Sequence, residues 1–197
     1  MDLSGKVCVI TGASSGIGKS LSIKFASRGA SVALAARRNS KLTSITDEIK
    51  QTGGNAIGIK TDITKSIECK NLIDETLDQY GRIDLLLLGA GVSMWTPFEK
   101  ISDISFFKDV MDTNYTGAVH CVHAALPHLI SSKGMVVTCS TAQAIVGFTN
   151  HSGYAASKHA LHGFLDTLDM ELDGKVLFLE AFLGWIRGTN MRSNAFG

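Results

Sequence analysis

The sequence predicts an α/β fold in which helices cover both faces of a doubly wound, mostly parallel sheet. Short apolar runs without alternation, typical of strands buried on both faces, take turns with segments of helical periodicity. The 197 residues, 45% of them hydrophobic, suffice for one domain with a sizeable core. Because no linker or low-complexity stretch interrupts the alternation, residues 1–197 are expected to form a single domain.

The predicted elements follow one another along the whole chain. Strands are expected at residues 6–10, 31–36, 56–60, 83–88, 135–138 and 175–182, where the apolar runs lie. Helices are expected at residues 17–28, 42–52, 67–80, 102–130 and 152–172, where apolar residues recur every three or four positions. Glu180 is unusual, because it places a carboxylate inside the last of these strands.

Composition argues against several classes of function. Lys and Arg number 19 against 18 Asp and Glu, and the densest basic site is Arg37-Arg38, so nucleic acid is not an expected partner. Apolar runs such as residues 85–88 fall far short of the roughly 20 residues of a membrane span, and the first residues do not resemble a signal peptide. A cytoplasmic protein is therefore expected. Four scattered cysteines without ligand spacing predict free thiols and no metal site.

A glycine-rich turn joins the first predicted strand to the first predicted helix. After Thr11 it contains Gly12, Ser14, Ser15, Gly16, Ile17 and Gly18. Glycines at such a junction permit a tight turn, close approach of a pyrophosphate and close packing of the helix on the strand, while the helix N-terminus attracts the anion. A plain connection is the alternative, but three glycines and two serines in this context favour a dinucleotide site.

The end of the second predicted strand indicates which dinucleotide binds. Sites for NAD usually carry Asp or Glu there, whereas this chain has Arg37 and Arg38 after Ala36. A guanidinium suits the 2′-phosphate of NADP, so NADP(H) is predicted rather than NAD(H), with Arg37 as the expected phosphate clamp. The alternative is that both arginines are solvated residues at the start of a helix.

Tyr154 and Lys158 lie four residues apart, hence on one face of a helix. A free tyrosine has a pKa of about 10, so a nearby cation would help it exchange protons near neutral pH. Ser140 and Thr141, at the end of the preceding strand, offer hydroxyls for a substrate oxygen. Asn114 weakens the long predicted helix, and a local break or water site is expected there. Taken alone, a Tyr-x-x-x-Lys pair is more often a surface pair than a catalytic one.

Together these residues resemble the short-chain dehydrogenase/reductase family. From Leu3 to Met191 the family's order and spacing are matched by the glycine turn, Asp62, Ala90-Gly91, Asn114, Tyr154 and Lys158. The resemblance implies a Rossmann-type sheet with strand order 3-2-1-4-5-6 and a nicotinamide cofactor. It also implies an oxidoreductase that acts on CH–OH groups, moving a hydride between the cofactor and a carbonyl or alcohol.

The resemblance assigns roles to individual residues. Tyr154 would be the general acid in reduction and the base in oxidation, Lys158 would lower its pKa and hold the nicotinamide ribose, and Asn114 would hold a water that links Lys158 to solvent. The hydroxyl that steadies the substrate oxygen is Thr141 by a gapless count, or Ser140 if a bulge intervenes. Further cofactor contacts are implied for Asp62, Ile63, Ala90, Gly91, Gly184, Ile186 and Thr189.

The chain also departs from the family pattern. Leu88-Gly89 replaces two asparagines, so an amide that braces neighbouring strands is lost and looser cofactor binding is expected. The segment that ends at Thr189 lacks the usual Pro-Gly turn and is only partly in register. Family members are commonly longer, so the C-terminal end is expected to be shortened, without a final strand and the helices that cover the substrate.

Bulky apolar residues follow the strand ends that face the cofactor. They are Trp95, Phe98, Ile145, Phe148, Trp185 and Met191. They favour an apolar ketone, aldehyde or alcohol, steroid-like or lipid-like, although core or dimer packing would explain any one of them. The helices at 114–130 and 152–172 are apolar on more than one face, which favours a homodimer or homotetramer. The alternative function is a catalytically weak dinucleotide-binding protein that senses the cofactor or binds a partner.

Overall fold

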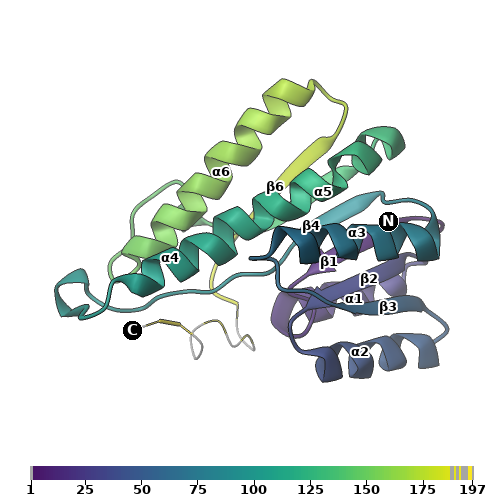
Figure 1. The fold of residues 1–197 in the computed structure, drawn as a ribbon, viewed down its shortest axis with the longest axis horizontal. Helices are drawn as coiled ribbons and strands as arrows, with labels where there is room; N and C mark the ends of the chain where they lie inside the picture. The colour runs from purple at the N-terminus through teal and green to yellow at the C-terminus, as the bar shows by residue number, and fades with distance from the viewer. Residues whose placement is uncertain (1, 187–188, 190, 192–194, 197) are drawn as a thin grey trace.

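The computed structural model describes residues 2–186, 189, 191 and 195–196. Within them, six parallel strands form one sheet in the order β3-β2-β1-β4-β5-β6 (Figure 1). The strands are β1 (Val7–Thr11), β2 (Ser31–Ala36), β3 (Asn55–Lys60), β4 (Leu85–Leu88), β5 (Met135–Thr141) and β6 (Leu177–Leu183). The chain starts at the centre of the sheet and winds first to one edge and then to the other, which confirms the predicted doubly wound α/β fold.

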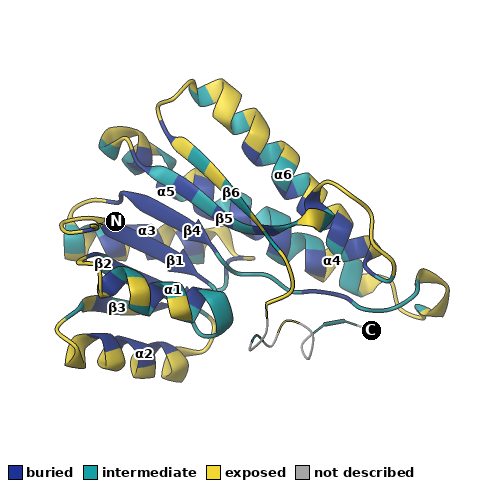
Figure 2. Ribbon diagram, turned by 180° about the vertical axis from the view of Figure 1, so that it is seen from behind, coloured by how far each residue is buried: buried dark blue, intermediate teal, exposed yellow. Residues whose placement is uncertain are grey.

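Helices pack against both faces of this sheet. One face carries α1 (Gly16–Ala26) and α2 (Asn39–Gln51); the other carries α3 (Ser66–Tyr80), α5 (Gly117–Ser132) and α6 (Ser152–Leu172). On β1, Val9 joins the core under α3, α5 and α6, while Cys8 and Ile10 join the core under α1 and α2. Burial on both faces explains the uninterrupted apolar runs of the central strands (Figure 2). None of the helices described is long and apolar enough to cross a bilayer.

The long predicted helix is divided by a π-helical turn. It consists of α4 (Ser105–Met111), a π turn at Asp112–Thr116 and α5. The turn contains Asn114, where the sequence predicts a break. A π turn inserts one residue into the hydrogen-bond ladder of a helix and often marks a functional site.

Strand β5 is longer than predicted. It continues past Thr138 through Ser140 and Thr141, which pair in register with Phe182 and Leu183 of β6. The prediction ended the strand early because these residues are polar, but the ladder to β6 holds them in it. Since successive side chains of a strand point to opposite faces, Ser140 and Thr141 face opposite sides of the sheet.

Asp84 ties the start of β4 to the start of β1. Its buried carboxylate accepts hydrogen bonds from the Arg82 guanidinium at 2.7 and 2.9 Å, from the Val7 N–H at 3.0 Å and from Lys6 Nζ at 3.2 Å. Burial raises the pKa of Asp84, but the hydrogen bonds from Arg82, Val7 and Lys6 outweigh it, so the pKa is lowered overall. The ionised carboxylate is therefore a structural part of the sheet.

Replacing Asp84 by Asn should lower the free energy of unfolding by about 2 kcal/mol, because several hydrogen bonds to a charged acceptor are weakened. Asp74→Asn is the matched control, since Asp74 pairs with Lys70 on an exposed helix face and should change stability by less than about 0.5 kcal/mol. Urea denaturation measures both.

The Asp84 contribution should also depend on pH. A carboxyl whose pKa is lower in the folded than in the unfolded chain stabilises fully above its unfolded pKa, about 3.9, and loses this effect as pH falls through the folded value. The stability difference between native protein and Asp84→Asn should therefore be constant near neutral pH and shrink below about pH 4. A difference that stays the same in acid would contradict this account.

Candidate active site

The carboxyl ends of the six strands meet at one edge of the sheet, and the predicted site residues follow them. They are the glycine turn after β1, Arg37 and Arg38 after β2, Asp62 after β3, Ala90 and Gly91 after β4, Thr141 at the end of β5, and Gly184 after β6. Residues distant in sequence are thus collected at one edge, where open α/β sheets bind ligands.

The glycine turn lies directly against the end of β4. Gly12 has φ +67°, and a Cβ there would stand 2.6 Å from the Gly89 carbonyl oxygen. A Cβ on Gly18 would stand 2.4 Å from the Gly12 carbonyl oxygen. No side chain fits at either position, so the backbone of the turn and the start of α1 form a close-packed cradle. This arrangement agrees with the turn and packing roles predicted for Gly12 and Gly18.

Thr11 supplies a brace that the sequence analysis missed. Its buried hydroxyl donates to the Leu87 carbonyl at 3.2 Å and accepts from the N–H groups of Gly89 and Ala90 at 3.1 and 3.3 Å. The ends of β1 and β4 are therefore joined although Leu88 offers no amide. The available signal was a polar residue ending a buried strand just before the glycine turn.

Arg38 reaches back to the glycine turn. Its Nη2 lies 2.8 Å from Ser14 Oγ and 3.2 Å from Ser15 Oγ, while both Arg37 and Arg38 remain exposed. Two serine hydroxyls thus hold a guanidinium beside the glycine turn without neutralising its charge. An anion at this place would meet the positive charge and the hydroxyls together.

Asp62 and Ile63, which follow β3, differ in which of their groups could contact a cofactor. The Asp62 carboxylate accepts from the Thr64 N–H and hydroxyl at 3.1 and 2.8 Å. Burial raises its pKa, but the Thr64 hydrogen bonds and the nearby charge of Arg37 outweigh this, so the pKa is lowered. The Ile63 side chain is instead buried in the core, where it packs against Gly117. A cofactor contact from Ile63 would therefore have to come from its backbone.

Asn114 is buried in the π turn and connects two elements of the site. Its Oδ1 accepts from the Val92 N–H at 2.8 Å, and its Nδ2 donates to the Val92 carbonyl and to Ser157 Oγ, both at 2.9 Å. Ser157, which sequence reasoning missed, in turn donates to the Tyr154 carbonyl at 2.7 Å. Both N–H groups of the Asn114 amide are engaged, so a water at this position would have to bind its Oδ1 or its backbone.

Tyr154 and Lys158 share one face of α6. Lys158 Nζ lies 5.8 Å from the centre of the Tyr154 ring and donates to the Cys139 carbonyl at 3.4 Å. Burial raises the pKa of Tyr154 to about 12 and lowers the pKa of Lys158. In this arrangement burial therefore dominates over the lowering of the tyrosine pKa that was expected from the lysine.

The two hydroxyls proposed to bind the substrate oxygen differ in how far they are buried. Ser140 is 5% exposed, and its hydroxyl is buried without a hydrogen-bond partner among the described residues. Thr141 is half-buried, and its Oγ1 accepts from the Gln143 N–H at 3.4 Å. Strand β5 pairs with β6 residue for residue through Ser140 and Thr141, so the ladder contains no bulge at these positions.

A chain of rings leads to Tyr154. Trp95 lies 4.6 Å from His151 and 5.4 Å from Trp185, and His151 lies 5.8 Å from Phe148 and 6.1 Å from Tyr154, between ring centres. His151 is buried at its centre and was missed, although it stands three residues before Tyr154. Three of the predicted apolar residues, Trp95, Phe148 and Trp185, thus take part in ring contacts near the tyrosine, with Phe148 51% and Trp185 70% exposed.

Other predicted residues are not part of this chain of rings. Phe98 packs against Phe107, with 6.1 Å between ring centres. Ile145 and Met191 are exposed, as are Gly184 and Ile186.

Thr189 lies beside the glycine turn: a Cβ on Gly16, where φ is +53°, would stand 3.5 Å from Thr189 Cγ2. The predicted contact after β6 is thus next to the turn although the register there departs from the family pattern.

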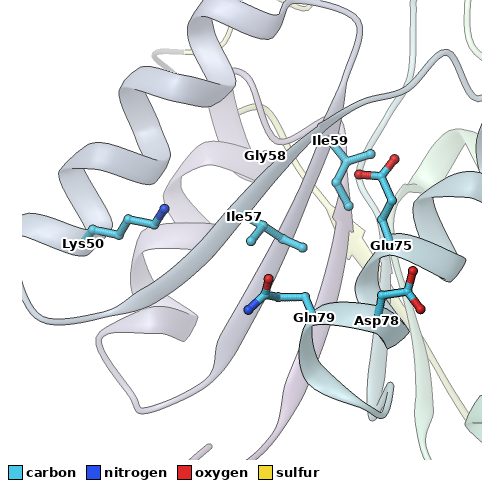
Figure 3. A pocket seen from close by; sticks show the side chains of 7 residues that line it. All are labelled: Lys50, Ile57, Gly58, Ile59, Glu75, Asp78 and Gln79. Atoms are coloured by element: carbon cyan, nitrogen blue, oxygen red, sulfur yellow. The ribbon is translucent and has the colours of Figure 1, made fainter.

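A shallow hollow of about 440 Å³ lies between α2 and α3 along the edge strand β3. It is lined by Lys50, Ile57, Gly58, Ile59, Glu75, Asp78 and Gln79 (Figure 3). None of these is a predicted site residue, and the glycine turn and Tyr154 do not line it. The strand-end edge remains the candidate active site.

The family model described as short chain dehydrogenase matches residues 6–196. Among curated relatives, the chain is 41% identical over 176 residues to 11-beta-hydroxysteroid dehydrogenase 1A from Arabidopsis thaliana, covering 89% of this chain and 50% of the relative. It is 38% identical over 196 residues to 11-beta-hydroxysteroid dehydrogenase-like 2 from the same plant, covering 99% and 63%. The chain thus spans about half to two thirds of the length of these relatives.

Solved structures show the same fold. An alcohol dehydrogenase from the archaeon Thermococcus sibiricus, complexed with 5-hydroxy-NADP, superposes with a TM-score of 0.90 at 26% identity, covering 98% of this chain and 81% of that one. A short chain dehydrogenase/reductase from Burkholderia phymatum, in complex with NAD, gives 0.92 at 27% identity, covering 98% and 70%. With its Rossmann-type sheet, its glycine cradle and a family match along nearly its whole length, this chain belongs to the short-chain dehydrogenase/reductase family of oxidoreductases.

Proposed function

We propose that this chain is an NADP(H)-dependent oxidoreductase that transfers a hydride between the cofactor and an apolar carbonyl or alcohol. The observation that carries the proposal is the strand-end edge, which unites the glycine cradle, the Arg38 guanidinium on its serines and the Tyr154–Lys158 pair. Relatives named as hydroxysteroid dehydrogenases support an apolar alcohol or ketone as substrate. Solved neighbours hold NADP in one case and NAD in another, so the choice of NADP rests on the arginines.

The described residues fit a dinucleotide. A pyrophosphate would lie against the turn, because the close packing at Gly12 and Gly18 leaves no room for side chains there. The start of α1 would supply N–H groups to it. Arg38, with Ser14, would bind the 2′-phosphate, and Arg37 would add a second positive charge. Asp62, the Ile63 backbone, Ala90 and Gly91 would line the rest of the path, and Thr189 would close over Gly16. When bound, the cofactor supplies or accepts the hydride.

Tyr154 handles the proton. In reduction its O–H gives a proton to the carbonyl oxygen while the carbon gains the hydride, and the resulting phenolate recovers a proton from solvent. In oxidation the phenolate takes the proton of the alcohol. The Lys158 ammonium favours the phenolate, and Thr141 donates a hydrogen bond that orients the substrate oxygen. Asn114 fixes the loop after β4 to α6, so these groups keep their relative positions.

The aromatic rings near Tyr154 favour an apolar substrate. Trp95, Trp185 and Phe148 would contact a rigid apolar body, with the reacting oxygen toward Tyr154. The exposed Ile130 of α5 and Met170 of α6 support association of copies through these helices, and the proposal therefore includes a homodimer or homotetramer.

Cofactor preference can be measured without a substrate. Energy transfer from Trp95 and Trp185 to the reduced nicotinamide reports binding, and native protein should bind NADPH more tightly than NADH. Arg38→Ala should weaken NADPH binding about tenfold or more, because a charge-assisted contact with the 2′-phosphate is lost, and should leave NADH binding nearly unchanged. Arg28→Ala, an exposed arginine beyond α1, is the control. Equal losses for both cofactors would remove the assignment of NADP(H).

Turnover should depend on Tyr154 in a pH-dependent way. Because burial raises the pKa of Tyr154 to about 12 and only the phenolate accepts a proton, alcohol oxidation should accelerate about tenfold per pH unit above neutrality. Carbonyl reduction should stay level up to about pH 10, because Tyr154 remains protonated well below that pKa. Rates with an apolar ketone and its alcohol between pH 6 and pH 10, roughly, test both directions.

Tyr154→Phe should reduce both rates by about 100-fold to 10,000-fold while NADPH binding persists. Turnover that survives this substitution unchanged would show that the assigned mechanism is wrong. Tight NADPH binding without turnover in the native protein would favour the dinucleotide-sensing alternative, and no binding of either cofactor would contradict the proposed function.

A further inference from the structure

Glu180 places a carboxylate behind the candidate active site. It lies on β6 opposite Thr138 of β5, its side chain is 14% exposed, and it faces α6, where His162 Nδ1 donates to its Oε2 at 2.5 Å. His162 stands one helical turn after Lys158, on the same face of α6. Tyr154, Lys158 and His162 thus follow one another along one face of α6, the helix that lies beside β6 in Figure 1.

Lys158 needs a negative charge that its immediate contacts do not provide. The ammonium is buried, and its hydrogen bond to the Cys139 carbonyl at 3.4 Å is long. An ammonium has three donors, and a charge buried without a partner is costly. Tyr154 and His162 on α6, the Cys139 thiol on β5 and Glu180 on β6 are the titratable groups around it. Burial lowers the pKa of Lys158, and negative charge at Cys139 or Glu180 would oppose that effect. Burial raises the pKa of the Cys139 thiol, which leaves Glu180 as the negative charge near neutral pH.

Three polar atoms near Glu180 have unused hydrogen-bonding capacity. Thr138 Oγ1, Ser140 Oγ and Glu180 Oε1 are buried and have no partner among the described residues. Thr138 and Ser140 alternate on the same face of β5, and Glu180 is the in-register neighbour of Thr138, so the three atoms share one face under α6. Buried groups of this kind are satisfied in proteins by an ordered water with two to four polar partners.

We propose that Glu180, held by His162, is a positioning residue for Lys158. Its carboxylate supplies the counter-charge that keeps the buried ammonium protonated, and a water bound by Thr138, Ser140 and Glu180 connects the two charges. Its effect on turnover rests on the proposed function, because only there does Lys158 act on Tyr154. The pairing of charges itself does not depend on that function.

The titration of Lys158 in the protein without cofactor tests the inference directly. Lysine labelled with ¹³C at Cε gives one signal for each side chain, and the Lys158 signal is the one lost in Lys158→Arg. In Glu180→Gln, which keeps the shape and removes the charge, the midpoint of the Lys158 titration should fall by about one pH unit. Glu180→Asp keeps the charge and should restore most of the shift. Glu171→Gln, on an exposed position of the same helix, is the control and should leave the midpoint unchanged.

A lowered midpoint in Glu180→Gln with recovery in Glu180→Asp supports the inference. An unchanged midpoint, or equal shifts in the two variants, overturns it, because the effect would then not follow the charge. If Glu180→Gln does not fold, Thr138→Val decides, since it removes a buried hydroxyl without a partner at nearly constant shape. If the midpoint of the Lys158 titration is lower in Thr138→Val than in the native protein, the linking water is supported. If the midpoint is unchanged, the inference is overturned. Failure of NADPH binding or turnover would overturn the proposed function and leave this titration unaffected.

Discussion

The close approach of the turn after β1 to the end of β4 is the constraint on which the site depends. A Cβ on Gly12 would overlap the backbone at Gly89, and the Thr11 hydroxyl bonds to three backbone groups of that same segment. This contact lets α1 begin immediately at the sheet and aims its N–H groups at the strand-end edge. Because β1 and β4 are the central strands, the positions of the Arg38 side chain and of the loop that holds Asn114 follow from it.

The second determinant is the burial of two ionisable groups, the neutral Tyr154 phenol and the cationic Lys158 ammonium, in the same low-dielectric region. Burial disfavours the charged form of both Tyr154 and Lys158, which moves their pKa values apart. Proton transfer at such a pair needs nearby charge to offset the burial. The Glu180–His162 pair lies one helical turn further along α6 than Lys158. Because the pKa values of these buried groups are shifted, their protonation also affects the stability of the fold.

The π turn shows how the helix adapts to its neighbours. A regular α-helix from Ser105 to Ser132 would carry Asn114 in a different direction relative to Val92 and Ser157. The extra residue allows the amide to make three hydrogen bonds in a buried position. This network joins the loop after β4 to the helix that bears Tyr154 and Lys158, so a local irregularity holds two parts of the site together.

The amino-acid sequence by itself determined the element order, the parallel doubly wound sheet and the glycine turn, because two-sided burial and φ > 0 positions leave direct traces in residue type. It also pointed to Asn114, Tyr154 and Lys158 by their spacing. Only the tertiary structure decided that the Thr11 hydroxyl joins the ends of β1 and β4, and which of Arg37 and Arg38 hydrogen-bonds to the turn. It likewise decided that the Ser140 hydroxyl is buried, whereas Thr141 is half-buried on the opposite face of the sheet. These outcomes depend on register between strands and on packing between distant segments, which no local pattern encodes. Glu180 is the clearest example. In the sequence it is only a charged residue within an apolar strand, and its contact with His162 of α6 depends on β6 lying beside β5.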